Sequence, residues 1–119
     1  MSVQLPPDVQ HKMMEYDNNV KAYEALINEL QQMKYRLTEI NTTIEELKKQ
    51  PDDVEVYKSV GSILFKSTKA KILEDLEDKR VVLDARIKST EKHEKTLKER
   101  INSLKTSLEA DLKRLGLMA

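Results

Sequence analysis

Apolar residues recur along the first and last parts of the chain mainly at steps of three and four positions, the spacing of one face of an α-helix. In the first part, this stripe consists of Val9, Met13, Tyr16, Val20, Tyr23, Ile27, Leu30, Met33, Leu37, Ile40, Ile44 and Leu47. In the last part, it includes Leu73, Leu76, Leu83, Ile87, Leu97, Ile101, Leu104 and Leu108. The pattern predicts two long amphipathic helices that meet along a narrow seam.

Prolines lie at the ends of the first stripe and not inside it. Pro6 and Pro7 precede this stripe, as proline in the first turn of a helix often does, and Pro51 follows it, where a helix must stop. We therefore expect one helix over residues 7–50 and a second over residues 69–115. Because a hairpin between them turns the chain back, the two helices should pair as a long antiparallel coiled coil.

Four polar residues interrupt the apolar seam of the second helix. They are Arg80, Thr90, Glu94 and Asp111. Polar side chains at seam positions weaken a coiled coil and can set its register. We expect these positions to reduce the stability of the seam and to favour one alignment of the two helices.

Between residues 53 and 67 the period of the apolar residues changes to two, which indicates strands. The runs Val54–Val60 and Ile63–Ser67 flank Gly61-Ser62, and glycine at the first central position suits a type II′ turn. That turn predicts three cross-strand pairs, which are Val60 with Ile63, Lys58 with Phe65, and Val56 with Ser67. One face would then carry Val56, Val60, Ile63 and Phe65, and the other Tyr57 and Leu64 among Ser59 and Lys66.

The apolar side chains of this hairpin need a partner that the chain does not supply. A single two-stranded hairpin is marginally stable in water, and both of its edges are open. We expect it to pair with hairpins of other subunits and so to close a sheet or barrel. The residues expected at that contact are Val56, Tyr57, Val60, Gly61, Ile63, Leu64 and Phe65. The alternative is that the hairpin folds back on the base of its own coiled coil.

Composition agrees with a thin helical protein and disfavours several functions. Aromatic residues make up 4% of the 119 residues and charged residues 35%, so we expect one domain over residues 1–119 without a thick core. Lys plus Arg and Asp plus Glu both number 21, and zero net charge disfavours nucleic-acid binding. The chain has no cysteine, signal peptide or apolar run long enough to span a membrane, so we expect a soluble, cytoplasmic protein.

No residue pattern indicates catalysis, a cofactor or a metal site. His11 and His93 lack a second ligand at helical spacing, and Asp52-Asp53 after a proline is typical of a turn. Nucleophile elbows, glycine-rich phosphate loops and zinc-protease helices are absent. We therefore expect no enzyme activity, no cofactor and no metal.

Apolar residues also gather near the two ends of the chain. They are Leu5, Val9, Met13 and Met14 near the start, and Leu112, Leu115, Leu117 and Met118 near the end. Antiparallel helices bring these segments together, and only part of such a set fits into a narrow seam. Clustered exposed apolar side chains tend to be interaction sites, and methionine adapts to varied apolar partners. The alternative is that these residues seal frayed helix ends.

The segment from Pro51 to Lys69 closely resembles the central hairpin of β-class prefoldin subunits. The shared pattern is an acidic turn, then Tyr-Lys-x-x-Gly and an apolar strand. In this chain the pattern is carried by Asp52, Asp53, Tyr57, Lys58, Gly61 and Ile63–Phe65. The opening Leu5-Pro-Pro-Asp-Val-Gln and the later Glu74-Asp-Leu-Glu-Asp-Lys-Arg are also similar to these subunits, so the resemblance covers the whole chain. Subunits of the α class insert a second hairpin, which is absent here.

The resemblance implies a molecular chaperone of the archaeal type that works without ATP. Subunits of this kind assemble into a hexamer of two α and four β subunits. Their hairpins form a double β-barrel platform, from which the coiled coils extend. The tips of the coiled coils, here the residues near the two chain ends, would bind unfolded client proteins and deliver them to a group II chaperonin.

Two other functions are compatible with long paired helices. A structural coiled-coil spacer or tether is the main alternative, and it would have polar, capped ends with no need for exposed apolar tips. A coiled-coil clamp for nucleic acid would need a basic stripe on one side, which the zero net charge and interspersed signs oppose.

Overall fold

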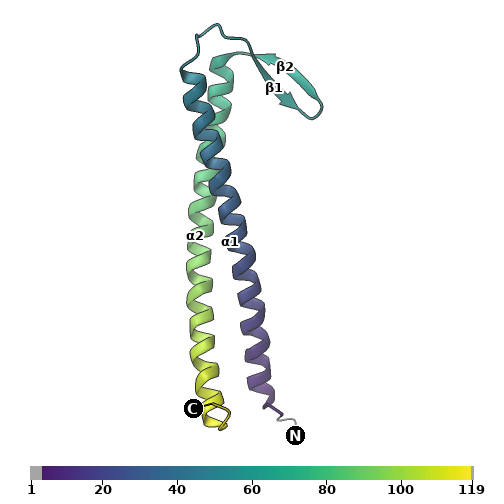
Figure 1. The fold of residues 1–119 in the computed structure, drawn as a ribbon, viewed down its shortest axis with the longest axis vertical. Helices are drawn as coiled ribbons and strands as arrows, with labels where there is room; N and C mark the ends of the chain where they lie inside the picture. The colour runs from purple at the N-terminus through teal and green to yellow at the C-terminus, as the bar shows by residue number, and fades with distance from the viewer. Residues whose placement is uncertain (1–3, 119) are drawn as a thin grey trace. The chain divides into compact units, whose positions relative to one another are not determined.

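The chain forms two long helices joined by one antiparallel hairpin, the arrangement that the sequence predicts (Figure 1). The computed structural model describes residues 4–118, and residues 1–3 and 119 of the expected domain lie outside this range. Helix α1 spans Pro7–Lys48, strand β1 Val56–Val60, strand β2 Ile63–Ser67 and helix α2 Lys69–Arg114. Compared with the expected limits, α1 ends at Lys48 and not at residue 50, and α2 ends at Arg114 and not at residue 115.

Internal contacts divide the chain into two compact units. The first consists of Met1–Leu30 and Thr90–Ala119, and the second of Gln31–Ser89. Helix α1 passes from the first unit into the second, and α2 passes from the second back into the first. The whole hairpin belongs to the second unit. Each unit thus contains one part of α1 and one part of α2, and the second unit also contains the hairpin.

In the first unit, the two helix segments lie antiparallel. Lys12 near the start of α1 contacts Asp111 near the end of α2, with 2.8 Å between Nζ and Oδ2. Further along α1, the Tyr23 hydroxyl donates to Glu94 Oε1 at 2.7 Å. Partners in α2 therefore run backwards as α1 proceeds. Among the described residues of this unit, the buried side chains are Val9, Leu30, Leu97 and Leu108.

In the second unit, apolar side chains of both helices again form the core. The buried ones are Met33, Ile44 and Leu47 of α1 and Leu83 and Ile87 of α2. Every buried side chain within residues 4–118 belongs to the apolar stripes that the sequence predicts, and none is polar or charged. The core of each unit is therefore a narrow seam, as expected for two amphipathic helices with no third layer.

The hairpin has the expected register. Val60 pairs with Ile63, Lys58 with Phe65, and Val56 with Ser67. Gly61 has a φ of 60°, and no non-glycine residue between positions 4 and 118 has a positive φ. A type II′ turn needs a positive φ only at its first central residue, whereas a type I′ turn needs one at both. The turn is therefore the type II′ turn expected for Gly61-Ser62.

One lysine joins the start of α2 to the end of α1. Lys69 Nζ donates to the carbonyl oxygens of Lys48 and Gln50, at 3.2 and 2.7 Å. It also lies 3.3 Å from Asp52 Oδ1, and the Lys69 side chain is only 13% exposed. The last carbonyl groups of a helix lack partners within the helix and carry partial negative charge. A cation at this point therefore stabilises the end of α1 and the turn that follows it.

We expect Lys69→Met to lower the free energy of unfolding by about 1 kcal/mol, because carbonyl groups at the end of α1 lose a charged donor. The matched control is Lys71→Met, which removes the same charge from the same helix turn. Lys71 is exposed, and its backbone N–H, which donates to the Thr68 hydroxyl at 3.2 Å, survives the change. Urea unfolding followed by circular dichroism measures both variants. Equal effects of the two substitutions would contradict the role of Lys69.

Candidate functional site

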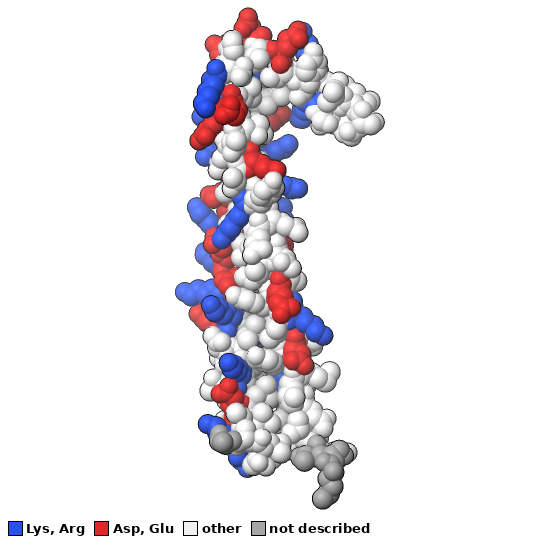
Figure 2. Space-filling model, in the orientation of Figure 1, with Lys and Arg blue, Asp and Glu red and all other residues white. Residues whose placement is uncertain are grey.

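Both faces of the hairpin are open to solvent. Exposure lies between 52% and 67% for Tyr57, Val60, Ile63, Leu64 and Phe65. Val56 is half-buried, and a Cβ added at Gly61 would meet nothing within 4 Å. In Figure 1 the strands project beside the helix ends with no helix over them, and Figure 2 shows the outer end of the hairpin free of charged side chains. The chain therefore leaves this apolar surface uncovered.

An ion pair links the hairpin to α2 at its base. Lys58 Nζ on β1 lies 3.0 Å from Asp75 Oδ2, and both side chains are about half exposed. Ion pairs at this exposure contribute at most about 1 kcal/mol. Because Tyr57, Val60, Ile63, Leu64 and Phe65 all remain more than half exposed, they are not packed against the base of the coiled coil, contrary to the alternative raised by the sequence. Its apolar residues are free to meet another subunit.

At the other end of α2, Gly116 terminates the helix in a defined motif. Gly116 has a φ of 75°, in the left-handed region that glycine tolerates. Its N–H donates to Lys113 O at 3.0 Å, and the Leu117 N–H donates to Leu112 O at 2.8 Å. These two bonds define a Schellman motif, which turns the chain back toward the last helical turn. Leu117 therefore lies beside α2 and does not extend it.

The start of α1 is also well defined. Pro6 O accepts hydrogen bonds from the N–H groups of Val9 and Gln10, each at 3.0 Å. The Gln10 side chain turns back, and its Nε2 donates to Leu5 O at 2.7 Å. Val9 is 0% exposed. Of the apolar residues expected at this end, Val9 is therefore part of the seam and not of an exposed surface.

Within residues 4–118, five large apolar side chains near the chain ends remain exposed. They are Met13, Met14, Leu115, Leu117 and Met118, with exposure from 37% to 66%. We refer to these five as the terminal apolar surface. Leu5 and Leu112 are half-buried. Clustered exposed methionine and leucine side chains are typical of an interaction site, because another molecule can cover the apolar surface that the chain leaves in water.

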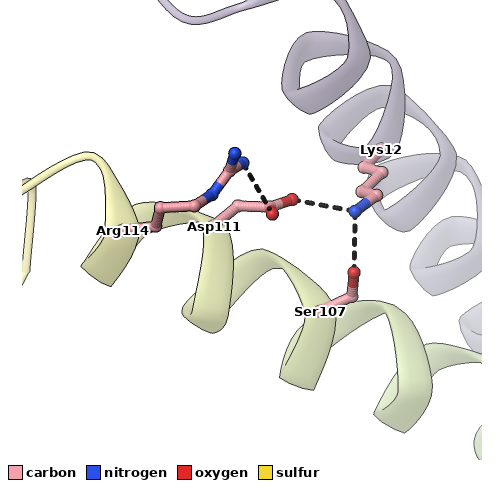
Figure 3. Close-up of polar contacts among 4 residues, drawn as sticks. All are labelled: Lys12, Ser107, Asp111 and Arg114. Atoms are coloured by element: carbon pink, nitrogen blue, oxygen red, sulfur yellow. Dashed lines mark hydrogen bonds and ion pairs between the residues drawn. The ribbon is translucent and has the colours of Figure 1, made fainter.

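A polar network crosses the seam of the first unit close to these residues (Figure 3). Lys12 Nζ donates to Ser107 Oγ and to Asp111 Oδ2, both at 2.8 Å. Arg114 Nη2 donates to Asp111 Oδ1 at 3.1 Å. The hydrogen bond from Lys12 holds the pKa of Asp111 below its ordinary value of 3.8, although partial burial acts in the opposite direction. Asp111 is one of the polar residues that interrupt the apolar stripe of the second helix, and its carboxylate thus finds a hydrogen-bond donor on the other helix.

A second polar contact joins Tyr23 to Glu94, another residue that interrupts the seam. The hydrogen bond to Glu94 raises the pKa of Tyr23 above 10.0, and desolvation and the negative charge of Glu94 act in the same direction. Glu15 and Arg100 form an exposed pair across the same unit at 2.8 Å. The sequence marked Glu94 as an interruption but not its partner, and it gave no role to Lys12 or Glu15. These contacts across the two helices can be predicted only when the alignment of the helices is known.

The described residues show no constellation for metal binding. Within residues 4–118, no group of three or more His, Cys, Asp or Glu side chains could hold a metal ion. His11 and His93 are both exposed. Within the same range, no helix is both long enough and apolar enough to cross a membrane. The hairpin and the terminal apolar surface are the candidate functional sites.

Comparison with known proteins points to one family. The family model described as "Prefoldin subunit" matches residues 10–114. A protein named "Prefoldin subunit beta" from Methanothrix thermoacetophila is 35% identical over 112 residues, which cover 94% of this chain and 93% of that protein. One of the same name from Thermococcus gammatolerans is 33% identical over 109 residues, covering 92% and 93%. The crystal structure of the prefoldin beta subunit from Thermococcus strain KS-1 is similar with a TM-score of 0.81 and 29% identity, covering 92% of this chain and 96% of that one.

We expect Asp111→Asn to destabilise the chain at neutral pH and to have little effect in strong acid. Folding lowers the pKa of Asp111, so the ionised carboxylate of this residue stabilises the fold. This contribution to the free energy of unfolding is present above pH 3.8 and is lost as the pH falls through the lower pKa of the folded state. Thermal unfolding at about pH 7 and about pH 2 measures the difference between parent and variant. Asp17→Asn, the same change at an exposed position of α1, is the control. A difference between parent and variant that persists at low pH would contradict the assignment.

Proposed function

The chain belongs to the prefoldin subunit family, whose members are components of chaperones, and from this premise we propose that it is a β-class subunit of an ATP-independent chaperone for non-native polypeptides. The observation that carries the proposal is the exposure of the terminal apolar surface, because a structural spacer needs no such side chains. The family resemblance of the hairpin motif supports the β class. Assembly, client capture and delivery are three steps of the proposal.

The open hairpin supports assembly with other subunits. In the part of the chain that the structure describes, its sheet consists of β1 and β2, so both strands present an unpaired edge. Unpaired edges and apolar faces together favour pairing with further strands, because a lone hairpin is marginal in water. We propose that hairpins of two α-class and four β-class subunits join in a β-barrel platform. Val56, Val60, Ile63 and Phe65 would lie on one face of this contact and Tyr57 and Leu64 on the other.

The terminal apolar surface supports client capture. Burial of a leucine or methionine side chain contributes roughly 1.5–3 kcal/mol when it is complete, and these side chains can be covered only in part by an irregular client. Each subunit would therefore bind a client weakly. Several subunits that hold one client would raise the effective concentration of the next contact, so that the assembly binds more tightly than any one chain.

Weak contacts also suit the transfer of a client to a group II chaperonin. A client held by several weak contacts can be released one contact at a time, so release needs no bound nucleotide. The sequence has two glycines and no glycine-rich phosphate loop, which agrees with a mechanism that does not use ATP. We propose that the chaperonin receives the client from the terminal apolar surface, with the hairpin platform unchanged.

Replacing Phe65 with Asp tests the assembly step. We expect the variant to lose the hexamer while it keeps most of its helical content, because a charge on a dry apolar face costs several kcal/mol. Native mass spectrometry of the protein mixed with its α-class partner measures assembly. Ser62→Asp, which adds the same charge in the turn, should assemble, and so should Phe65→Leu. A Phe65→Asp hexamer of native mass would show that this face is not part of the platform.

Replacing Met14, Leu117 and Met118 with Ser tests client capture. The variant should assemble normally but fail to suppress aggregation of a denatured model protein without ATP, because its largest exposed terminal side chains are gone. The control removes two exposed side chains of the second unit, Tyr35→Ser with Val81→Ser, and should protect like the parent. Moderate salt should change protection little, since it screens charges and not apolar contacts. Full protection by the serine variant would favour the spacer function.

A further inference from the structure

The second unit has an open groove with an apolar floor between α1 and α2. The groove has a volume of about 370 Å³, and Ile40, Val82 and Leu83 contribute its apolar side chains. Leu83 belongs to the buried seam, whereas Val82 is 61% exposed. Clefts that hold small ligands begin at roughly this size. The groove can therefore accept one or two apolar side chains of another molecule over Val82.

A basic rim surrounds this floor. Arg36, Lys79 and Arg86 line the groove, and Asp78 is the one acidic residue that does so. No ion pair or side-chain hydrogen bond joins any of these four side chains to another residue within positions 4–118. Three cations against one acid leave an excess of positive charge. The guanidinium groups of Arg36 and Arg86 thus have no partner among residues 4–118, although each could hold a carboxylate through two hydrogen bonds.

A second groove in the same unit shows that this free charge is not a general property of the helices. The second groove has a volume of about 270 Å³ and is lined by Leu37, Asn41, Arg80, Val81 and Asp84. Its charged groups are already paired, because Arg80 contacts Glu77 and Asp84 lies 3.3 Å from Lys88. Val81 is 63% exposed, nearly the same as Val82. Each groove thus has its own exposed valine, and the two grooves differ in that the first has unpaired positive charge.

We propose that the groove between Arg36 and Arg86 is a docking site for an acidic segment of a partner protein that carries an apolar side chain. The apolar side chain covers Val82 and Ile40, and carboxylates on either side of it pair with the basic rim. Charge complementarity selects this occupant, because a basic segment would meet three unpaired cations and an uncharged one would leave them unused. The groove shares no residue with the hairpin or with the terminal apolar surface, and it serves a partner selected by charge and not a non-native client.

Fluorescence anisotropy with the full-length protein tests the proposal. The probe is a short fluorescein-labelled peptide with two leucines among glutamates and serines. We expect Arg36→Gln combined with Arg86→Gln to weaken its binding about ten-fold, and Val82→Ser about three-fold. The matched controls act at the second groove, where Arg80→Gln combined with Lys88→Gln removes the same charge and Val81→Ser the same apolar group. Both controls should keep the affinity within about two-fold of the parent.

Several results would overturn the proposal. An equal loss in the Arg80 and Lys88 control would show that binding follows net charge and not the groove. Equal binding of a peptide with lysines in place of glutamates would show capture of any apolar segment. Self-association that Arg36→Gln with Arg86→Gln abolishes would make a second copy of the chain the occupant. Binding should persist when Met14, Leu117 and Met118 are changed to Ser, and its loss there would place the peptide on the terminal apolar surface.

Discussion

The seam between two helices is the constraint on which the rest of this structure depends. Each helix presents one apolar stripe, and two such stripes bury only the side chains that lie in the seam, among them Leu30 and Leu97 in the first unit and Ile44 and Leu83 in the second. A chain with 4% aromatic residues has few large side chains with which to build a thicker core. Apolar residues outside the seam must therefore remain exposed or be covered by another molecule.

Polar residues in the seam give the thin core a single alignment. An apolar stripe tolerates sliding by a helical turn, because one leucine packs much like the next. Asp111 and Glu94 do not tolerate it, since a shift would separate them from Lys12 and Tyr23 and leave polar groups partly buried without partners. The terminal apolar surface depends on this alignment, because the Lys12 contact places the turn of α1 with Met13 opposite the last turns of α2.

Much of this fold could be predicted from the sequence, because its signals are local. Spacing predicts the helices, and Gly61-Ser62 predicts a turn that determines every strand pair. The sequence placed Val9 both in the seam and among the exposed residues near the chain ends, and it did not predict the partner of Asp111, since both points depend on the alignment of two segments about a hundred positions apart in the chain. The groove with Arg36 on its rim could not be predicted for the same reason. Residues of two helices line it, and in the sequence of either helix alone they are typical of a solvated helix face.

The exposed surfaces of this chain differ in physical character, and that difference indicates different kinds of partner. A hairpin edge requires strands in a defined register, so it suits a fixed subunit contact. Exposed methionine and leucine near the helix ends place no demand on register or charge, so they suit clients of many sequences. The groove over Val82 combines an apolar floor with unpaired arginines, and it rejects partners of the wrong charge. Because the seam buries so few apolar residues, one short chain can expose the hairpin, the terminal apolar surface and the groove over Val82 without losing its fold.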